Sequence, residues 1–205
     1  MQLSGLRYGS QLLSLVEFPY ADVVTGGANK EEIQQMLDKY GKLVVKPFFY
    51  GGVGKKGKAG LVKIVDNLVD ALEAKRELYF ATHKHGNKVT RANGITMEEF
   101  VNAELEVYFS ITASTVHRRP IFTISPHGGV DIESLDETKK KIVEIDPFIG
   151  LKSFDVTNAL VDTGCPEKYI SALVRFIPKL WDLYESYGLT TIEINQIRVA
   201  KRGNQ

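Results

Sequence analysis

The chain has 205 residues, with 26 lysines and arginines against 25 aspartates and glutamates, a net charge of +1. This length can bury a sizeable core, as one domain of two lobes or as two small domains. The balanced charge argues against nucleic acid or a membrane surface as the main partner. A single cysteine, Cys165, excludes an internal disulfide, and no segment approaches the roughly 18 apolar residues of a membrane span. We therefore expect a soluble, cytoplasmic protein.

The N-terminal third begins with two helical patterns. Residues 1–20 carry a modest helical pattern that ends at Pro19. A capped amphipathic helix follows, with Asn29 as its cap and Gly41 just past its end. This second helix leads directly into an apolar strand over residues 43–49.

A glycine- and lysine-rich segment separates the strand at 43–49 from a second strand at 60–65. Its glycines allow close approach of the main chain to a ligand, and its lysines supply charge for an anion. The segment matches P-loop spacing, but Ala59 stands where Ser or Thr would bind Mg²⁺, and a strand follows instead of a helix. We predict a hairpin flap that closes over a polyphosphate; a flexible basic turn without a ligand is the alternative.

Asp66 is expected to cap the next helix. The polar stretch from Lys75 to Gly94 is predicted to be an exposed connection. His83 and His85 within it suggest a metal site, but no third ligand is evident, so a solvated loop is favoured.

The middle of the chain is rich in strand patterns. Runs at 95–101 and 106–113 are separated by a short polar turn, and a third strand covers 121–125. The third strand leads into His127-Gly-Gly-Val-Asp-Ile-Glu133, either an anion-binding turn or merely a tight turn.

The last third predicts helices and a final strand. Ser153 is the expected cap of one helix. Pro166 begins a long helix that Pro178 should kink, and a strand covers residues 190–199. The alternation of strands and helices indicates an α/β or α+β fold.

Lys46 and three glutamates are the first candidates for chemistry. Lys46 lies within an apolar strand, where a negative group such as a nucleotide phosphate would offset the cost of burying its charge. Glu98 and Glu106 lie near the two ends of one turn, with Glu99 beside them, where they could read an adenine amino group and a ribose. Surface glutamates flanking a turn are the competing interpretation.

Glu193 and Asn195 are two residues apart on the final strand, so they share one face. Ile192 and Ile194 supply the other face. Oxygen ligands on one strand face suit Mg²⁺, which takes one or two protein groups together with water and substrate phosphates. An exposed face of an edge strand is the competing explanation.

Five short motifs occur in a set order. They are Val-Lys-Pro at 45–47, Gly-Lys-x-Gly-Leu-Val at 57–62, Glu-x-Phe-Val at 98–101, Gly-Gly-Val-Asp-Ile-Glu at 128–133 and Ile-Glu-Ile-Asn at 192–195. As a set they resemble the ATP-grasp region of the β-type subunit of ADP-forming acyl-CoA synthetases, including succinyl-CoA synthetase. The likeness is strongest to ATP-citrate lyase and citryl-CoA synthetase and weakest before residue 40.

This resemblance implies an ATP-grasp fold, in which two α+β lobes, about residues 20–97 and 98–205, grip ATP and Mg²⁺. The implied roles are phosphate contact for Lys46, adenine and ribose contact for Glu98 and Glu106, and Mg²⁺ binding for Asn195. Glu193 would face a phosphohistidine of the partner.

The flap implied by the resemblance contributes further nucleotide contacts. Lys56, Gly57 and Lys58 would lie over the phosphates. The loop between Lys46 and Gly57 is about two residues longer than the family pattern leads us to expect.

The resemblance also implies partners. An α-type subunit would carry the phosphohistidine and the CoA-binding domain, because none of the four histidines here matches that motif. ATP would phosphorylate this histidine, and the phosphoryl group would pass to citrate or another carboxylic acid before CoA attacks. Positioning and charge neutralisation carry such a transfer.

Two departures from the family pattern remain. Gln196 stands where proline usually follows Glu-Ile-Asn, and the sequence stops at Gln205, before the strand whose aspartate completes the Mg²⁺ site and before the CoA-ligase domain. We therefore expect a truncated nucleotide-binding module. The alternatives are another ADP-forming acyl-CoA synthetase and a non-catalytic nucleotide-binding or assembly module.

Overall fold

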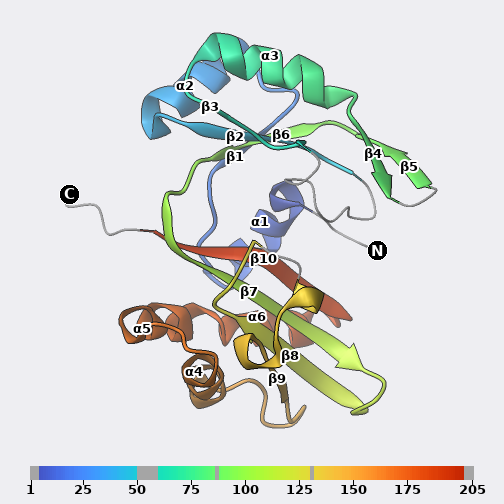
Figure 1. Ribbon diagram of the computed structural model, residues 1–205, viewed down its shortest axis with the longest axis vertical. Coiled ribbons are helices and arrows are strands. Elements are labelled where there is room, and N and C mark those ends of the chain that lie inside the picture. Colours follow the sequence, from blue (N-terminus) through green and yellow to red (C-terminus); the bar gives the residue numbers. More distant parts are fainter. Residues whose placement is uncertain (1–4, 50–59, 86–87, 130–131, 201–205) are drawn as a thin grey trace. The chain divides into compact units, whose positions relative to one another are not determined.

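The computed structural model describes residues 5–49, 60–85, 88–129 and 132–200. The chain forms two compact units, of residues 1–12 with 20–101 and of residues 13–19 with 102–205. Each unit has its own four-stranded sheet and its own hydrophobic core (Figure 1). The boundary near residue 101 lies slightly after the one expected from the sequence. Helix α1 (Leu6–Leu15) begins in the first unit and ends in the second.

The first unit is built on an antiparallel sheet in the order β1-β6-β2-β3. The predicted hairpin around the glycine-rich loop is confirmed, because Leu43 of β2 pairs with Val65 of β3. The loop itself lies outside the described residues. The four strands are β1 (Val23–Thr25), β2 (Leu43–Pro47), β3 (Lys63–Val65) and β6 (Ile95–Glu99).

Helices α2 (Lys30–Tyr40) and α3 (Leu68–Tyr79) cover one face of this sheet (Figure 1). The predicted Asn29 cap is confirmed as a capping box, and Gly41 ends α2 with φ of 72°. The cap of α3 is Asn67, where Asp66 was expected, because the Asn67 side chain accepts the Asp70 N–H at 2.9 Å. Apolar side chains between helices and sheet form the core, including Ile33, Leu43, Val45, Ala71, Leu78 and Met97.

The expectation of an exposed connection from Lys75 to Gly94 is wrong. Its first residues complete α3, and the rest forms a hairpin of β4 (Thr82–His85) and β5 (Lys88–Arg91). His83 is buried, with its ring 6.2 Å from that of Phe49. The strand alternation here is polar on both faces, so hydrophobic periodicity did not reveal it.

The second unit is built on an antiparallel sheet in the order β10-β7-β8-β9. Strand β7 is the longest, and its Val107, Phe109 and Ile111 point into the core while alternate residues face the other side. The strands are β7 (Ala103–Ser114), β8 (Arg119–Ser125), β9 (Lys141–Glu144) and β10 (Thr191–Ala200), with 3₁₀ turns at Ile132–Ser134 and Glu137–Lys139 between β8 and β9.

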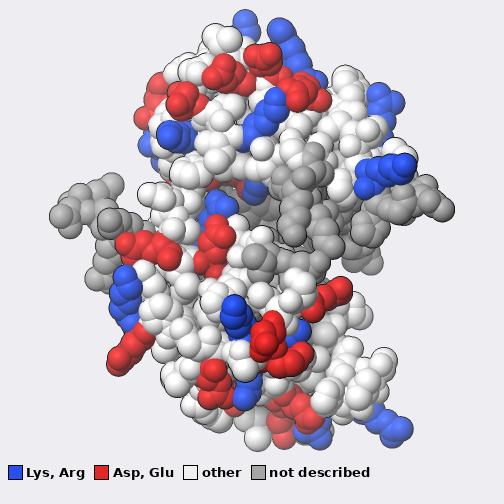
Figure 2. Space-filling model, viewed as in Figure 1, with Lys and Arg blue, Asp and Glu red and all other residues white. Residues whose placement is uncertain are grey.

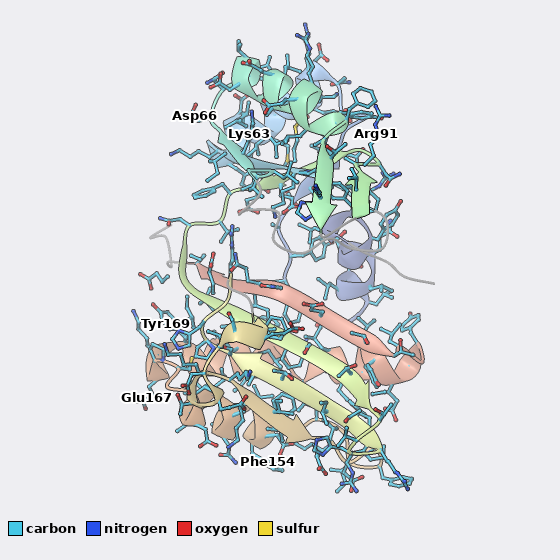
Figure 3. The ribbon with its side chains drawn as sticks, turned by 45° about the vertical axis from the view of Figure 1, so that its right-hand side comes forward. Lys63, Asp66, Arg91, Phe154, Glu167 and Tyr169 are labelled. Carbon is cyan, nitrogen blue, oxygen red and sulfur yellow. The ribbon has the colours of Figure 1, made fainter. Side chains whose placement is uncertain are left out.

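Helices α4 (Ser153–Asp162), α5 (Glu167–Phe176) and α6 (Lys179–Ser186) cover the core face of this sheet (Figure 1). Ser153 is the first helical residue, and the cap position belongs to Lys152. At the predicted kink the chain forms two helices, α5 and α6, because proline has no N–H for the helical ladder, while Ile177 and Pro178 between them keep helical dihedral angles. Tyr169 of α5 donates a 2.7 Å hydrogen bond to Glu104 of β7 (Figure 3).

Acidic and basic side chains are interspersed on the face shown in Figure 2, in line with the balanced composition. Among the described helices, none is long and apolar enough to span a bilayer.

Candidate functional site

Lys46 and Glu98, which are 52 residues apart in sequence, form an ion pair in the first unit. They lie on neighbouring strands β2 and β6, with Lys46 paired to Thr96 and Val44 paired to Glu98. The Thr96 hydroxyl donates to the other carboxylate oxygen of Glu98 at 3.0 Å. Strand alternation therefore places Lys46, Thr96 and Glu98 on one face of the sheet, opposite the core.

The Lys46–Glu98 pair is only partly accessible. The side chain of Glu98 is 11% exposed and that of Lys46 is 33% exposed. Both oxygens of the Glu98 carboxylate are engaged, by Lys46 and by Thr96, so this carboxylate orients the lysine. An ammonium held at the end of a buried strand is suited to contact a phosphate.

Polar side chains line the outer face of the sheet in the second unit. Glu193 lies opposite Ser110, and Asn195 lies opposite Tyr108, which in turn lies opposite Ser125. Glu193 and Asn195 are exposed, whereas the other three are buried. The strand register thus puts Glu193 and Asn195 on the same face of the sheet, as the sequence predicted.

Tyr108 is the central residue of this polar face. It is 7% exposed, and burial raises the pKa of its phenol, with a further rise from the charge of Glu193 and an opposing effect of the Ser110 hydrogen bond. The phenol stays protonated around neutral pH and can donate a hydrogen bond beside Glu193.

Glu106 lies near the start of β7, on the same face as Tyr108. Its carboxylate lies 3.2 Å from Arg198 of β10, and its carbonyl accepts the Gly128 N–H at 2.7 Å. A Cβ added at Gly128 would lie 2.8 Å from the Glu106 backbone, so only glycine allows this close approach. The predicted glycine turn therefore packs directly on Glu106. Val130 and Asp131 lie outside the described residues.

Gln196 occupies a bulge in β10. The register passes from Asn195 opposite Tyr108 to Ile197 opposite Val107, leaving Gln196 without an opposite residue. Its side-chain oxygen is buried and has no hydrogen-bond partner in the described part of the chain. The bulge lets Asn195 face outward while Ile197 packs against the core.

The structure thus groups the predicted residues in two sets. Lys46 and Glu98 are in contact in the first unit, and Glu106, Glu193 and Asn195 share the polar face of the second. Lys56, Gly57 and Lys58 lie outside the described residues.

Sequence reasoning missed five polar residues of these two sets, which are Thr96, Tyr108, Ser110, Ser125 and Arg198. Tyr108 and Ser110 were predictable from the alternation Glu-Val-Tyr-Phe-Ser-Ile-Thr, in which every second residue is polar. Thr96 and Arg198 carry no local signal, because their partners come from distant segments or are identified only by register.

The donor set is compatible with Mg²⁺. Asn195 offers an amide oxygen and Glu193 a carboxylate on an exposed face, the hard oxygen donors that Mg²⁺ prefers. Among the described residues, no three His, Cys, Asp or Glu side chains form a metal-binding group. A cation here would take the remaining ligands from water and phosphate oxygens.

Comparison with known families gives a match over residues 14–199 to an ATP-grasp domain. Curated β subunits of succinate–CoA ligase [ADP-forming] are also similar. The one from Chlorobium limicola is 30% identical over 180 residues, which cover 85% of this chain and 46% of the relative. The β subunit from Halobacterium salinarum is 32% identical over 150 residues, which cover 72% of this chain and 38% of the relative. The chain thus spans about half the length of the curated relatives it matches.

Two solved structures share the fold. ATP citrate lyase from Methanothrix soehngenii, in complex with citrate and coenzyme A, has a TM-score of 0.68 at 24% identity and covers 96% of this chain and 45% of its own. A dinucleotide-forming acetyl-coenzyme A synthetase from Ca. Korarchaeum cryptofilum, in complex with coenzyme A, Ca-AMPCP and HgCl⁺, has a TM-score of 0.70 at 15% identity, covering 96% and 87%.

Proposed function

The chain belongs to the ATP-grasp domain family, and from this premise we propose that it is the nucleotide-binding part of the β-type subunit of an ADP-forming acid–CoA ligase. The observation that carries the proposal is the Lys46–Glu98 ion pair on neighbouring strands. Similarity to succinate–CoA ligase β subunits over most of this chain supports the reaction class.

Each candidate residue has a proposed role in binding ATP and Mg²⁺. Lys46 contacts the phosphates, and Glu98 holds its ammonium in place while lying at the end of β6 where the adenine binds. Glu106 binds the ribose hydroxyls. Lys56, Gly57 and Lys58 cover the phosphates from the flap.

Asn195 and Glu193 act at the phosphoryl end of the site. Asn195 binds Mg²⁺ through its amide oxygen, and the cation neutralises charge on the transferring phosphoryl group. Glu193 faces a histidine of the partner α-type subunit, where its carboxylate orients the imidazole. Tyr108 is placed to hold Glu193 by a hydrogen bond on the same face.

The carboxylic acid that we propose for the complete enzyme is citrate, with citryl-CoA as the product formed in the presence of CoA. The five motifs and the structural likeness to ATP citrate lyase support this choice. Succinate is the second candidate, and the names of the curated relatives favour it. A non-catalytic nucleotide-binding or assembly module is the alternative from another class.

Calorimetric titration of the chain with ATP·Mg²⁺ and ADP·Mg²⁺ tests the nucleotide site. We expect saturable binding that Lys46→Ala and Glu98→Ala each weaken by about tenfold or more, because a charge-assisted contact is lost. Lys42→Ala is the matched control, since Lys42 is exposed in the same unit. Equal binding by the Lys46 and Lys42 variants would refute the assigned site.

The acid is tested in the assembled complex with its α-type partner. ADP release that depends on both CoA and citrate supports the citrate proposal. ADP release that depends on CoA and succinate, and does not occur with citrate, supports the second candidate. Nucleotide binding without acid-dependent release from the complex would favour the assembly module.

A further inference from the structure

A small cavity lies at the edge of the first sheet, separate from the Lys46–Glu98 pair but sharing a wall with it. Its volume is about 80 Å³, and the chain lines it from α1, the β1–α2 loop, the end of β2 and the start of β6. This is several times the roughly 10–15 Å³ that a single water requires, yet well below the roughly 300 Å³ of the smallest drug-sized sites. The space suits a small ion.

Backbone hydrogen bonds fix the walls of this cavity. The Gly26 N–H donates to the Ile95 carbonyl at 3.0 Å, and the Phe48 N–H donates to the Gly94 carbonyl at 2.8 Å. A Cβ at Gly26 would lie 3.1 Å from Ile95 and Tyr79 side-chain atoms, so glycine permits this close packing. The ends of β1 and β2 are thus joined to the start of β6 by paired main-chain groups, which hold the cavity walls in place.

Among the described residues that line the cavity, Arg7 is the only charged one, and none is an aspartate or glutamate. Helix α1 is held here because the Tyr8 ring packs 5.8 Å from the Phe48 ring. In the described part of the chain, no carboxylate pairs with Arg7, whose guanidinium lies 5.3 Å from the centre of the Tyr8 ring. An arginine without a carboxylate partner retains its full capacity to bind an anion.

Hydroxyl groups complete the lining. Thr25 lines the cavity, and its side chain makes no hydrogen bond to another described residue. Thr96 also lines it, and its hydroxyl donates to Glu98, which links the cavity to the candidate nucleotide residues. A cation and a free hydroxyl that line one space match the needs of an oxyanion.

We propose that this cavity binds a small oxyanion, a phosphate or a carboxylate, through the Arg7 guanidinium and the Thr25 hydroxyl. The site is additional to the nucleotide site of the proposed function and does not depend on it. Its shared wall at Thr96 places the ion next to the residues that orient Lys46.

The test is calorimetric titration of the chain with inorganic phosphate and, separately, with succinate. Arg7→Gln should weaken binding of the preferred ion by about tenfold or more, because a charge-assisted interaction is lost. Thr25→Val should weaken it less, since only one neutral hydrogen bond is lost. Arg76→Gln, on the exposed side of α3 in the same unit, should leave binding unchanged.

The readouts separate this cavity from the nucleotide site. Lys46→Ala should lose nucleotide affinity but retain phosphate or succinate binding, and Arg7→Gln should do the reverse. Saturable binding of either ion that requires Arg7 supports the proposal and identifies the source as phosphate or carboxylate. No saturable binding of either ion, or equal binding by the Arg7 and Arg76 variants, would overturn it and leave a cavity filled with water only.

Discussion

At the scale of single residues, the chemistry of the first unit depends on one strand-to-strand contact. Glu98 is buried, and its burial is tolerable because Lys46 and Thr96 occupy both of its oxygens. Removing one partner of such a pair leaves the other polar group unsatisfied, which costs more than the pair itself contributes.

We therefore predict that Glu98→Gln lowers the free energy of unfolding by about 1–3 kcal/mol, because the Lys46 ammonium loses its charged partner. Chemical denaturation measures this change, provided that the m-value is the same for the variant and the wild type. The control is Glu73→Gln on the exposed side of α3, which should change stability by no more than about 0.5 kcal/mol. Equal effects of the two substitutions would show that the Lys46–Glu98 pair is not formed in solution.

Gly150 illustrates a second constraint at residue scale. It adopts φ of 75° before α4, and a Cβ added there would lie 2.5 Å from the Trp181 indole nitrogen. Gly164 has almost the same φ, 74°, but no atom lies within 4 Å of its added Cβ.

The pair of glycines separates backbone strain from overpacking. Gly164→Ala should cost about 1–2 kcal/mol of stability from the left-handed conformation alone. Gly150→Ala should cost a further 1–3 kcal/mol, approximately, because Trp181 must move from its packed position. Thermal unfolding followed by Trp181 fluorescence measures both. A Gly150 variant no less stable than the Gly164 variant would contradict the packing described.

At the scale of elements, the end of β6 is fastened by β1 and α2. The Asp22 carbonyl accepts the Glu99 N–H at 3.0 Å, and the Asp22 carboxylate accepts from Tyr40 and from Lys39, the latter at 2.9 Å. The Tyr40 hydrogen bond, followed by that of Lys39, lowers the pKa of Asp22 below its usual 3.8. Glu99, which Asp22 holds, directly follows Glu98 in the sequence.

The lowered pKa predicts a pH-dependent contribution to stability. A carboxyl group whose pKa is lower in the folded than in the unfolded chain contributes its full stabilisation at pH values above 3.8. This stabilisation is lost as the pH falls through the lower pKa of the folded chain. Asp22→Asn should therefore be less stable than the wild type near neutral pH, with the difference shrinking below pH 3.8. When Tyr40→Phe is present in both proteins, the stability difference between the chain with Asp22 and its Asp22→Asn variant should be smaller, because the Tyr40 hydrogen bond contributes most to the lowered pKa of Asp22. Denaturation curves over this pH range measure it, and a difference that is constant with pH would contradict the assignment.

Much of the element pattern was predictable from the sequence. The capping box at Asn29, the β2–β3 hairpin and the period-2 pattern of β7 depend on neighbouring residues, so local chemistry was sufficient. The short strands β1, β4, β5 and β9 lack a clear hydrophobic period, because they are edge strands or polar on both faces. The kink predicted at Pro178 takes the form of a two-residue break between α5 and α6.

At the scale of the whole molecule, the comparisons confirm the ATP-grasp fold that the five motifs suggested. The candidate site residues are distributed over both units, three described ones on the second and Lys46 with Glu98 on the first. A ligand that binds the folded chain stabilises it by mass action.

We predict that ATP·Mg²⁺ at about one hundred times its dissociation constant stabilises the folded chain by about 2.7 kcal/mol. Differential scanning fluorimetry over a nucleotide series measures the corresponding rise in the unfolding temperature. The rise should fall to about half or less in Lys46→Ala and stay unchanged in Lys42→Ala. A rise of equal size in both variants would mean that the nucleotide binds elsewhere on the chain.

By itself, the sequence determined the family, the helix capped by Asn29, the glycine turn and the shared face of Glu193 and Asn195, because each depends on residues close together in the chain. Only the tertiary structure decided that β6 lies between β1 and β2, while β7, the next strand, belongs to another sheet. It also decided the contact of Lys46 with Glu98 and the cavity at Arg7. Such pairings are selected by the burial of segments distant in sequence, which a local pattern does not encode.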